Sequence, residues 1–421
     1  MDPLLMAVCI VMTFAGAALG LFSGLVPGIH VNTLSSMMLA SYPAIQGMLS
    51  GVVDSTGAAM AVCCCVMSAS VVHSFVDFVP SVFIGAPDAE DAVSILPGHR
   101  LLLEGRGMDA VKAAASGSLV GACCAVLLAV PLQYVMSTTL GDVTDRLAWT
   151  VAFIASSVIV LGCGPVTSMA HGVAAFIMSG VLGLTVSLLP IPCEGVLGEG
   201  TLMFPMLAGL FGIPMLLASG KGAPHPTQRP PCDEPARMMS GLRGVLMGCI
   251  AGWFPGITST VGASMSSCIF RERSPEDFIS NVASIGTVTS VLSVVALSVS
   301  GSGRSGTAIV LRELSGGMIS GIASSTFLLV MLATAVSAFT GYWLTIWSGN
   351  RMASMMSGLD PRLLNRTVLA VNIILVLLLT GPYGLLILAV STTIGMIPDS
   401  CGTSRIVLCG CLLLPVLLPT V

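Results

Sequence analysis

The sequence predicts an all-α polytopic membrane protein. Of its 421 residues, 55% are hydrophobic and only 9% are charged, and the mean hydropathy is +0.98. A soluble domain carries about 25% charged residues, and no soluble core hides so much apolar surface. The apolar runs are long and continuous, whereas a transmembrane β-barrel needs alternating segments of about ten residues. Helices, which satisfy their own backbone hydrogen bonds in lipid, are therefore expected.

Hydrophobic runs near the ~20 residues needed to cross the hydrocarbon core mark the expected helices. Several runs are short or interrupted, so we expect about 10–13 transmembrane helices, some of them broken or re-entrant. The first run lacks a basic region before it and a cleavage site after it, so it is interpreted as a span of a multi-pass plasma-membrane protein. The runs fall at 4–26, 31–50, 57–84, 110–136, 146–163, 166–190, 199–219, 241–254, 257–270, 279–300, 316–347, 364–379, 383–397 and 405–420.

A polar, proline-rich linker at 220–240 divides the chain into an N-terminal transmembrane repeat, 1–219, and a C-terminal transmembrane repeat, 241–421. The repeat is proposed from one ungapped match. Residues 20–37 read GLFSGLVPGIHVNTLSSM and residues 248–265 read GCIAGWFPGITSTVGASM, with seven identities that include a Pro-Gly-Ile core. This exceeds what shared apolar composition would give, so the chain is interpreted as duplicated.

Basic residues predict the orientation, because Lys and Arg concentrate on cytoplasmic loops. If the basic clusters are all cytoplasmic, the loop at 85–97 faces the cytoplasm and the loop at 301–306 faces the exterior. The two halves would then form an inverted repeat, a construction common among secondary transporters. Repeats of the same direction stay open as the alternative. The clusters are Arg100, Arg106 and Lys112; Lys221, Arg229, Arg237 and Arg243; and Arg351, Arg362 and Arg366.

The two Pro-Gly motifs predict breaks in membrane-embedded helices, since proline removes a hydrogen bond and glycine permits other backbone shapes. A half-helix that starts after each break would point free N–H groups and its positive dipole end inward, where they could bind an anion. Polar residues, Ser35 and Ser36 among them, follow the first break. The alternative is a proline kink packed against neighbouring helices. The expected substrate-binding residues are Pro27, Gly28, His30, Asn32, Thr33, Pro255, Gly256, Thr258, Ser259 and Thr260.

The loop SGSGRSGT at 300–307 is a second candidate for anion binding. Successive glycines can form a nest of N–H groups for an oxyanion, and Arg304 could bind a carboxylate with two parallel hydrogen bonds. The alternative is an external turn with its arginine among the lipid headgroups. The expected binding residues here are Ser302, Gly303, Arg304 and Ser305.

Three acids in the loop GAPDAEDAV, Asp88, Glu90 and Asp91, are candidates for ion coupling. Carboxylates suit Na⁺ as a hard cation, and they could also relay H⁺. The alternative is a solvated loop in which Asp88 caps a helix. His30, His73 and His171 stand in apolar surroundings, where a histidine is more often a packed core residue. The cysteines lack zinc spacing, so no metal and no cofactor is expected.

The sequence predicts a membrane permease for small organic anions such as carboxylates, driven by an ion gradient. No metalloprotease, nucleophile-elbow or ATP-binding motif is present, so we do not expect an enzyme. No basic patch suits nucleic acid, and the net charge is −4. The alternative from another class is a membrane-embedded structural or assembly subunit without transport activity of its own.

Motifs along most of the chain resemble the permease subunits of tripartite tricarboxylate transporters, the TctA family, in a shorter archaeal-type branch. They are GLVPGIHVNT, LPGHRLLLEGRGMDAVKAAASGS, FPGITSTVGAS, SGSGRSGTA and IGMIPDSCGTSRIVLCGCLLLPVLLP. The resemblance implies carboxylate import with a cation, beside an extracytoplasmic binding protein and a small membrane subunit. It places Pro27-Gly28, Pro255-Gly256 and residues 301–306 on the family's Pro-Gly and glycine-rich loops. The acids at 86–91 and Arg304 depart from the family pattern.

Overall fold

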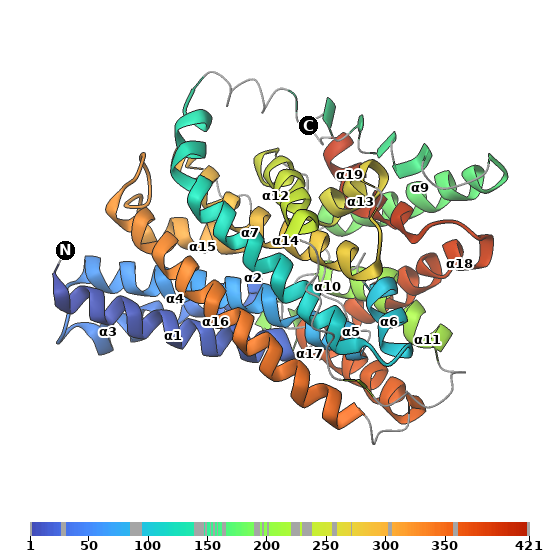
Figure 1. Ribbon diagram of the computed structural model, residues 1–421, viewed down its shortest axis with the longest axis horizontal. Helices are drawn as coiled ribbons and strands as arrows, with labels where there is room; N and C mark the ends of the chain where they lie inside the picture. The colour runs from blue at the N-terminus through green and yellow to red at the C-terminus, as the bar shows by residue number, and fades with distance from the viewer. Residues whose placement is uncertain are drawn as a thin grey trace.

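Within the described residues, the regular structure of the computed structural model is helical apart from a β-hairpin whose two strands have two residues each (Figure 1). Seven helices among the described residues are long and apolar enough to cross a membrane, and two shorter apolar helices, Met203–Gly212 and Arg405–Pro415, accompany them. The predicted all-α polytopic membrane fold is confirmed. The structure describes residues 2–26, 31–84, 95–138, 166–188, 194–195, 198–199, 202–219, 228–229, 238–254, 259–270, 272–301, 305–356 and 361–418, with most positions of 147–161.

Among the described residues of the first half, eleven helices or helical segments have defined bounds. The strands of the hairpin pair Glu194 with Glu199 in antiparallel register. Several short helices stand between the long ones, as expected of broken spans. The elements are α1 (Pro3–Leu25), α2 (Val31–Ala40), α3 (Tyr42–Leu49), α4 (Ser55–Val76), α5 (Phe78–Ile84), α6 (Ile95–Leu103), α7 (Gly107–Met136), α9 (Val166–Leu188), β1 (Glu194–Gly195), β2 (Gly198–Glu199), α10 (Met203–Leu207), the π-helical η2 (Ala208–Gly212) and α11 (Ile213–Ser219).

The second half shows where the predicted spans were wrong. The run at 316–347 begins as turns, because Gly316, Gly317 and Gly321 adopt positive φ, and its helix starts only at Ser325. The runs at 364–379 and 383–397 form one element that is broken at Gly381 (φ 66°, ψ −161°) before Pro382. The elements are α12 (Met238–Trp253), α13 (Ser259–Ile269), α14 (Pro275–Ser300), α15 (Gly306–Ser315), α16 (Ser325–Met356), α17 (Pro361–Gly395), α18 (Ile397–Cys401), the 3₁₀-helical η3 (Arg405–Cys409) and α19 (Gly410–Leu417).

Two helix pairs pack through matching rows of glycines. On α1 and on α12, every fourth residue over two turns is a glycine, and a Cβ at any of them would press on the neighbouring helix, α4 or α14. Small residues of this kind let helix backbones approach closely in a membrane. The two pairs share one register: Gly16, Gly20 and Gly24 meet Ser68, Val72 and Val76, while Gly244, Gly248 and Gly252 meet Ser284, Val288 and Leu292.

The contacts also fix the directions of these pairs. Helix α4 runs parallel to α16, because Ser68 contacts Ser337 and Phe75 contacts Gly341. Helix α7 runs parallel to α14, because Gly117 meets Ser280 while Gln133 bonds Ser298. Helices α7 and α16 are antiparallel, because Val111 meets Gly349 whereas Gln133 accepts from Ala323 at the other end. Helix α4 therefore runs opposite to α14, which is the arrangement an inverted repeat predicts.

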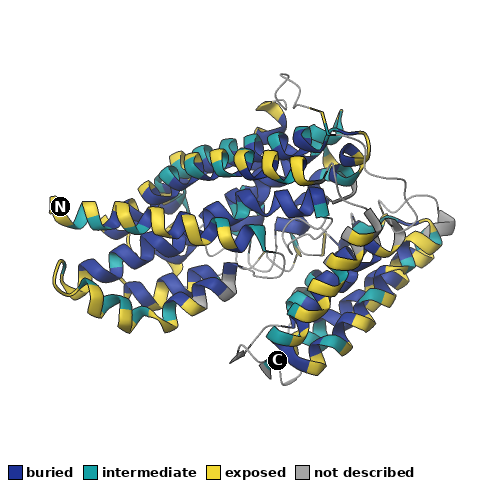
Figure 2. Cartoon of the chain, turned by 90° about the horizontal axis from the view of Figure 1, so that it is seen from below, coloured by how far each residue is buried: buried dark blue, intermediate teal, exposed yellow. Residues whose placement is uncertain are grey.

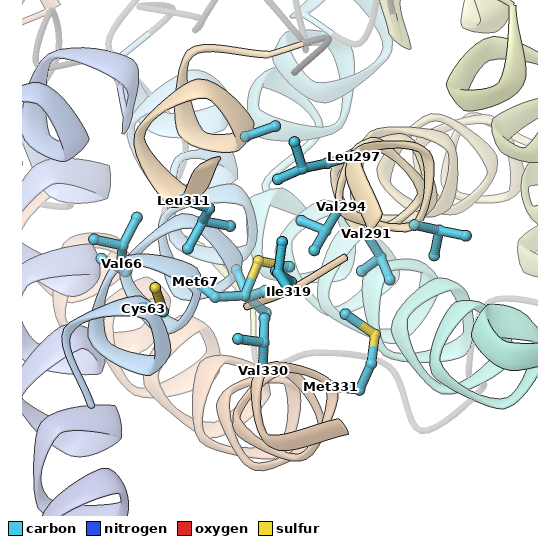
Figure 3. Close-up of a cluster of buried hydrophobic side chains, with 14 of the residues drawn as sticks. Cys63, Val66, Met67, Val291, Val294, Leu297, Leu311, Ile319, Val330 and Met331 are labelled. Atoms are coloured by element: carbon cyan, nitrogen blue, oxygen red, sulfur yellow. The ribbon is translucent and has the colours of Figure 1, made fainter. Parts of the chain in front are cut away.

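The two halves share a large apolar cluster of buried side chains. Helix α7 of the first half packs on α14, and α15 and α16 of the second half pack on α4. Side chains from α4, α14, α15 and α16 converge there, among them Met67, Val294, Leu311 and Val330 (Figure 3). In Figure 2 the buried residues line the facing sides of the helices and the exposed ones their outer sides, as expected for helices with lipid around them. This cluster therefore combines residues from both sides of the predicted linker at 220–240.

Basic residues of all three predicted clusters lie at one end of this bundle. The Arg229 N–H donates to the Gly105 carbonyl (2.8 Å), and Arg106 pairs with Asp109 (2.9 Å) and with Glu276 at the start of α14. Burial lowers the pKa of Arg106, but its bonds to the two carboxylates raise it more, so the net pKa is above the ordinary value. Gly349, two residues before Arg351, packs on the first turns of α7.

Candidate functional site

The first Pro-Gly motif stands between two helices. Helix α1 ends at Leu25, Val26 is extended, and α2 begins at Val31. Pro27, Gly28 and His30 lie outside the described residues. Asn32 and Thr33 are in the first turn of α2, but their side chains are also outside the description. One helix therefore ends and another begins where the sequence predicted a break.

The second Pro-Gly motif has the same setting. Helix α12 ends at Trp253 and α13 begins at Ser259, while Pro255, Gly256 and Thr258 lie outside the described residues. Ser259 and Thr260 are buried at the start of α13. One turn later, the Ser264 hydroxyl lies 3.4 Å from the Cys409 thiol of η3. Helix α13 is thus anchored to the C-terminal part of the chain.

The glycine-rich loop joins α14 to α15. Gly301 ends α14 in the left-handed conformation (φ 67°), which glycine adopts without a Cβ clash. Ser302, Gly303 and Arg304 lie outside the described residues. Ser305 caps α15: its hydroxyl accepts from the Ala308 N–H (3.1 Å) and lies 3.2 Å from the Ser293 hydroxyl of α14. The start of α15 is therefore fixed against α14.

The structure brings together the helix that follows the first Pro-Gly motif, α2, and the helix that follows the glycine-rich loop, α15. The Ser35 hydroxyl on α2 lies 3.3 Å from the Thr307 hydroxyl in the first turn of α15. Both side chains are buried, at 1% and 5% exposure. Two half-helices from opposite halves of the chain thus meet through neutral hydroxyls, at the N-terminal, positive end of the α15 dipole. This junction of α2 with α15 is the candidate anion site.

The predicted ion-coupling residues are not part of the described structure. Asp88, Glu90 and Asp91 fall in 85–94, outside the described residues, and the chain resumes as α6 at Ile95. Within the described residues, no group of three or more His, Cys, Asp or Glu side chains is placed to hold a metal ion.

Sequence reasoning missed a buried acid, Asp77, and treated His73 as a packed core residue. Both lie inside the span Ser55–Ile84, at 5% and 4% exposure. A signal was available, because an ionisable residue in a long apolar run is a functional candidate by default. Sequence reasoning also did not pair Ser35 with Thr307, since only the fold brings them into contact.

Comparison with known proteins decides the family. A family model described as the tripartite tricarboxylate transporter TctA family matches residues 10–410. The chain belongs to this family. An uncharacterized protein of Methanocaldococcus jannaschii is 27% identical over 305 residues, 71% of this chain and 71% of that protein. No solved structure matches the chain.

Membership confirms the resemblance drawn from the motifs. TctA proteins are components of tripartite tricarboxylate transporters, in which a binding protein and a small membrane subunit accompany the TctA chain. Together with the seven apolar helices, this makes the chain a multi-pass transporter component of the plasma membrane. The family is a transporter family and not an enzyme family.

Proposed function

We propose that this TctA protein is the permease that moves small carboxylates across the membrane, driven by an ion gradient, and that it binds the anion where α2 meets α15. The contact between Ser35 and Thr307 carries the proposal, because it places two half-helices from opposite halves side by side in a buried, polar setting. Discontinuous helices at the interface of two repeats are the usual site of substrate binding in secondary transporters.

Neutral donors suit a carboxylate in this buried setting. The positive end of the α15 dipole and the hydroxyls of Ser35 and Thr307 favour an anion without the cost of burying a permanent charge. Arg304 directly precedes the cap residue Ser305 in the sequence and would supply the one cation, bound to the carboxylate through two N–H groups. Binding and release of the carboxylate change no covalent bond, so the proposal includes no enzymatic step.

The opposed helix pairs support an alternating-access mechanism. Pair α1–α4 and pair α12–α14 have the same internal register and opposite directions, so a small rocking of one against the other would exchange the exposed side of a site between them. We also propose that the chain works with a small membrane subunit and an extracytoplasmic binding protein, as its family membership suggests.

A thermal-shift screen of the purified protein with di- and tricarboxylates tests the binding step, because a ligand of the folded state raises the melting temperature. Hits are then followed as radiolabelled uptake into proteoliposomes, with Na⁺ or pH gradients imposed. We expect saturable uptake that needs a gradient for accumulation. Absence of binding and uptake across the panel, with the family's partner subunits also present, would favour a structural or assembly subunit instead.

A further inference from the structure

Two ionisable side chains, one in the last turn of α4 and one on the residue that follows α4, lie buried inside the candidate span Ser55–Ile84. His73 and Asp77 are 4% and 5% exposed, and four residues separate them, so they share one face of the helix. A charged group in the hydrocarbon region is costly, and such residues mark ion or proton pathways in transporters. The proposed anion site at Ser35 and Thr307 uses neither of them.

Hydrogen bonds hold the side chain of His73 and the backbone of Asp77 in place. Nδ1 of His73 lies 2.9 Å from the Ser23 hydroxyl of α1, and that hydroxyl is also 3.2 Å from the Gly20 carbonyl. Asp77 stands where α4 gives way to α5: its N–H donates to the His73 carbonyl (2.9 Å) and its carbonyl accepts from Ser81 (3.1 Å). The chain therefore continues through Asp77 while its carboxyl group stays inside the protein.

The shared register of the two helix pairs identifies the residues of the second half that correspond to His73 and Asp77. The shared register of Gly24 with Gly252 and of Val76 with Leu292 equates Ser23 with Ala251, His73 with Thr289, and Asp77 with Ser293. Ser293 contacts Ser305, the cap of α15 at the proposed anion site. At these equivalent positions the first half thus has two titratable side chains where the second half has two hydroxyls.

The other charged side chains on the elements packed against α4 pair with one another or lie near the ends of their helices. Helices α1, α2, α3 and α5 contain no Asp, Glu, Lys, Arg or His. On α15, Arg312 pairs with Glu313 (3.6 Å), and both are about half exposed. The acids of α7 and α14 sit at their first turns, where Arg106 binds Asp109 and Glu276. Asp277 is also in the first turn of α14, and Lys112 is in the second turn of α7. Arg351 lies near the end of α16, and Tyr342 is the titratable group in the middle of α16.

We propose that His73 and Asp77 form the proton site that couples transport to a pH gradient, an inference that rests on the proposed carboxylate transport. The Asp77 carboxylate takes up one proton on the side of low pH and becomes a neutral carboxylic acid. It releases the proton on the other side after the halves have changed their orientation. His73 passes the proton to it, as imidazole does in proton relays. Na⁺ fits less well, because a hard cation requires several oxygen ligands and imidazole nitrogen is not one.

A structural role for Asp77 is the competing explanation, since its side chain is buried where α4 gives way to α5. Asp77→Asn separates the two roles, because Asn has nearly the same size and keeps a side-chain carbonyl acceptor but does not titrate near neutral pH. Asp54 supplies a matched control: it caps the opposite end of α4, with its carboxylate accepting from the Gly57 N–H (2.8 Å), and it is exposed. Asp54→Asn therefore removes a charge from the same helix without touching the buried pair.

The test measures two activities of full-length protein in liposomes, with radiolabelled citrate and a second carboxylate chosen by the binding screen. Exchange at equal pH reports substrate movement, and accumulation under an inward proton gradient reports coupling. We expect wild type and Asp54→Asn to show both activities. Asp77→Asn should keep exchange and lose accumulation, and His73→Gln should keep exchange and shift the pH dependence of accumulation.

The outcomes distinguish coupling from transport itself. Accumulation by Asp77→Asn at the wild-type level would overturn the inference, and so would wild-type accumulation that follows a Na⁺ gradient and ignores pH. Loss of both activities in a monodisperse Asp77→Asn protein would assign Asp77 to structure or substrate binding instead. If Asp77→Asn does not fold, His73→Gln decides: wild-type pH dependence in that variant contradicts the relay. Absence of exchange in wild type, with the family's partner subunits also present, would instead overturn the proposed function.

Discussion

The hydroxyl of Ser35 on α2 lies 3.3 Å from the hydroxyl of Thr307 on α15, although 272 positions separate them in the chain. Since both are buried at the junction of two half-helices, Thr307→Val should reduce carboxylate affinity and cost roughly 1 kcal/mol of stability through the lost hydrogen bond. Ser35→Ala should act in the same direction. A double-mutant cycle, read by ligand titration and by thermal unfolding, measures their coupling. Purely additive effects on affinity would place the two hydroxyls outside a common site.

The glycine row of α1 makes a prediction about folding. Gly16→Ala places a methyl group against the Cys65 carbonyl of α4, so we expect a loss of about 1–3 kcal/mol from overpacking. The matched control is Gly47→Ala on α3, where the added methyl meets no neighbouring atom and should stabilise the helix by up to about 1 kcal/mol. Melting temperatures in detergent compare the two. Equal effects of the two substitutions would contradict the close packing of α1 on α4.

The basic end of the bundle predicts its orientation. The Gln228 side chain bonds the backbone of Leu102 and Gly107, so cysteines at positions 106 and 228 should react with a membrane-impermeant thiol reagent from the same, cytoplasmic side. The turn before α4 lies at the opposite end, so Ser50→Cys should react from outside. The background must lack reactive native cysteines. Labelling of Arg106→Cys from the outside of intact cells would reverse the orientation.

A buried carboxylate anchors α13 near this end. Glu272 pairs with Arg243 (3.4 Å) and accepts from Asn281 (3.0 Å), and its side chain is only 6% exposed. Glu272→Ala removes the acceptor shared by Arg243 and Asn281, so we expect a loss of about 1–3 kcal/mol. The double variant with Arg243→Met should recover part of it, because no unpaired charge remains. Unfolding measurements on both variants check this, and a double variant less stable than Glu272→Ala would refute the pairing.

Composition and pattern determined the fold class, because an apolar chain of this kind has few alternatives to helices in a bilayer. The helix breaks at the two Pro-Gly motifs were also predictable, since proline and glycine act locally. Short helices such as α6 and α15 were missed because they are polar for a membrane protein and stand within loops. The turn at Gly316 and Gly317 was read as part of a span because its neighbours are apolar.

Pairings between the halves could not be read from the sequence. The contacts of Ser35 with Thr307 and of Ser68 with Ser337 depend on how the halves interlock, which local patterns do not specify. Asp77 is different: its apolar neighbours were visible, but its burial became known only from the packing of α4. The predicted roles of Arg304, Asp88, Glu90 and Asp91 stay predictions.

The carboxylate affinity of the Arg304 variants directly tests the proposal that an anion binds where α2 meets α15. The measurement is an equilibrium titration of wild type, Arg304→Lys and Arg304→Ala with the best carboxylate of the binding screen, each variant shown to be monodisperse. We expect Arg304→Lys to weaken binding, because an ammonium does not reproduce the planar two-pronged contact, and Arg304→Ala to cost about 1.5–3 kcal/mol. Wild-type affinity in Arg304→Ala would contradict an anion site beside Ser305 and Thr307.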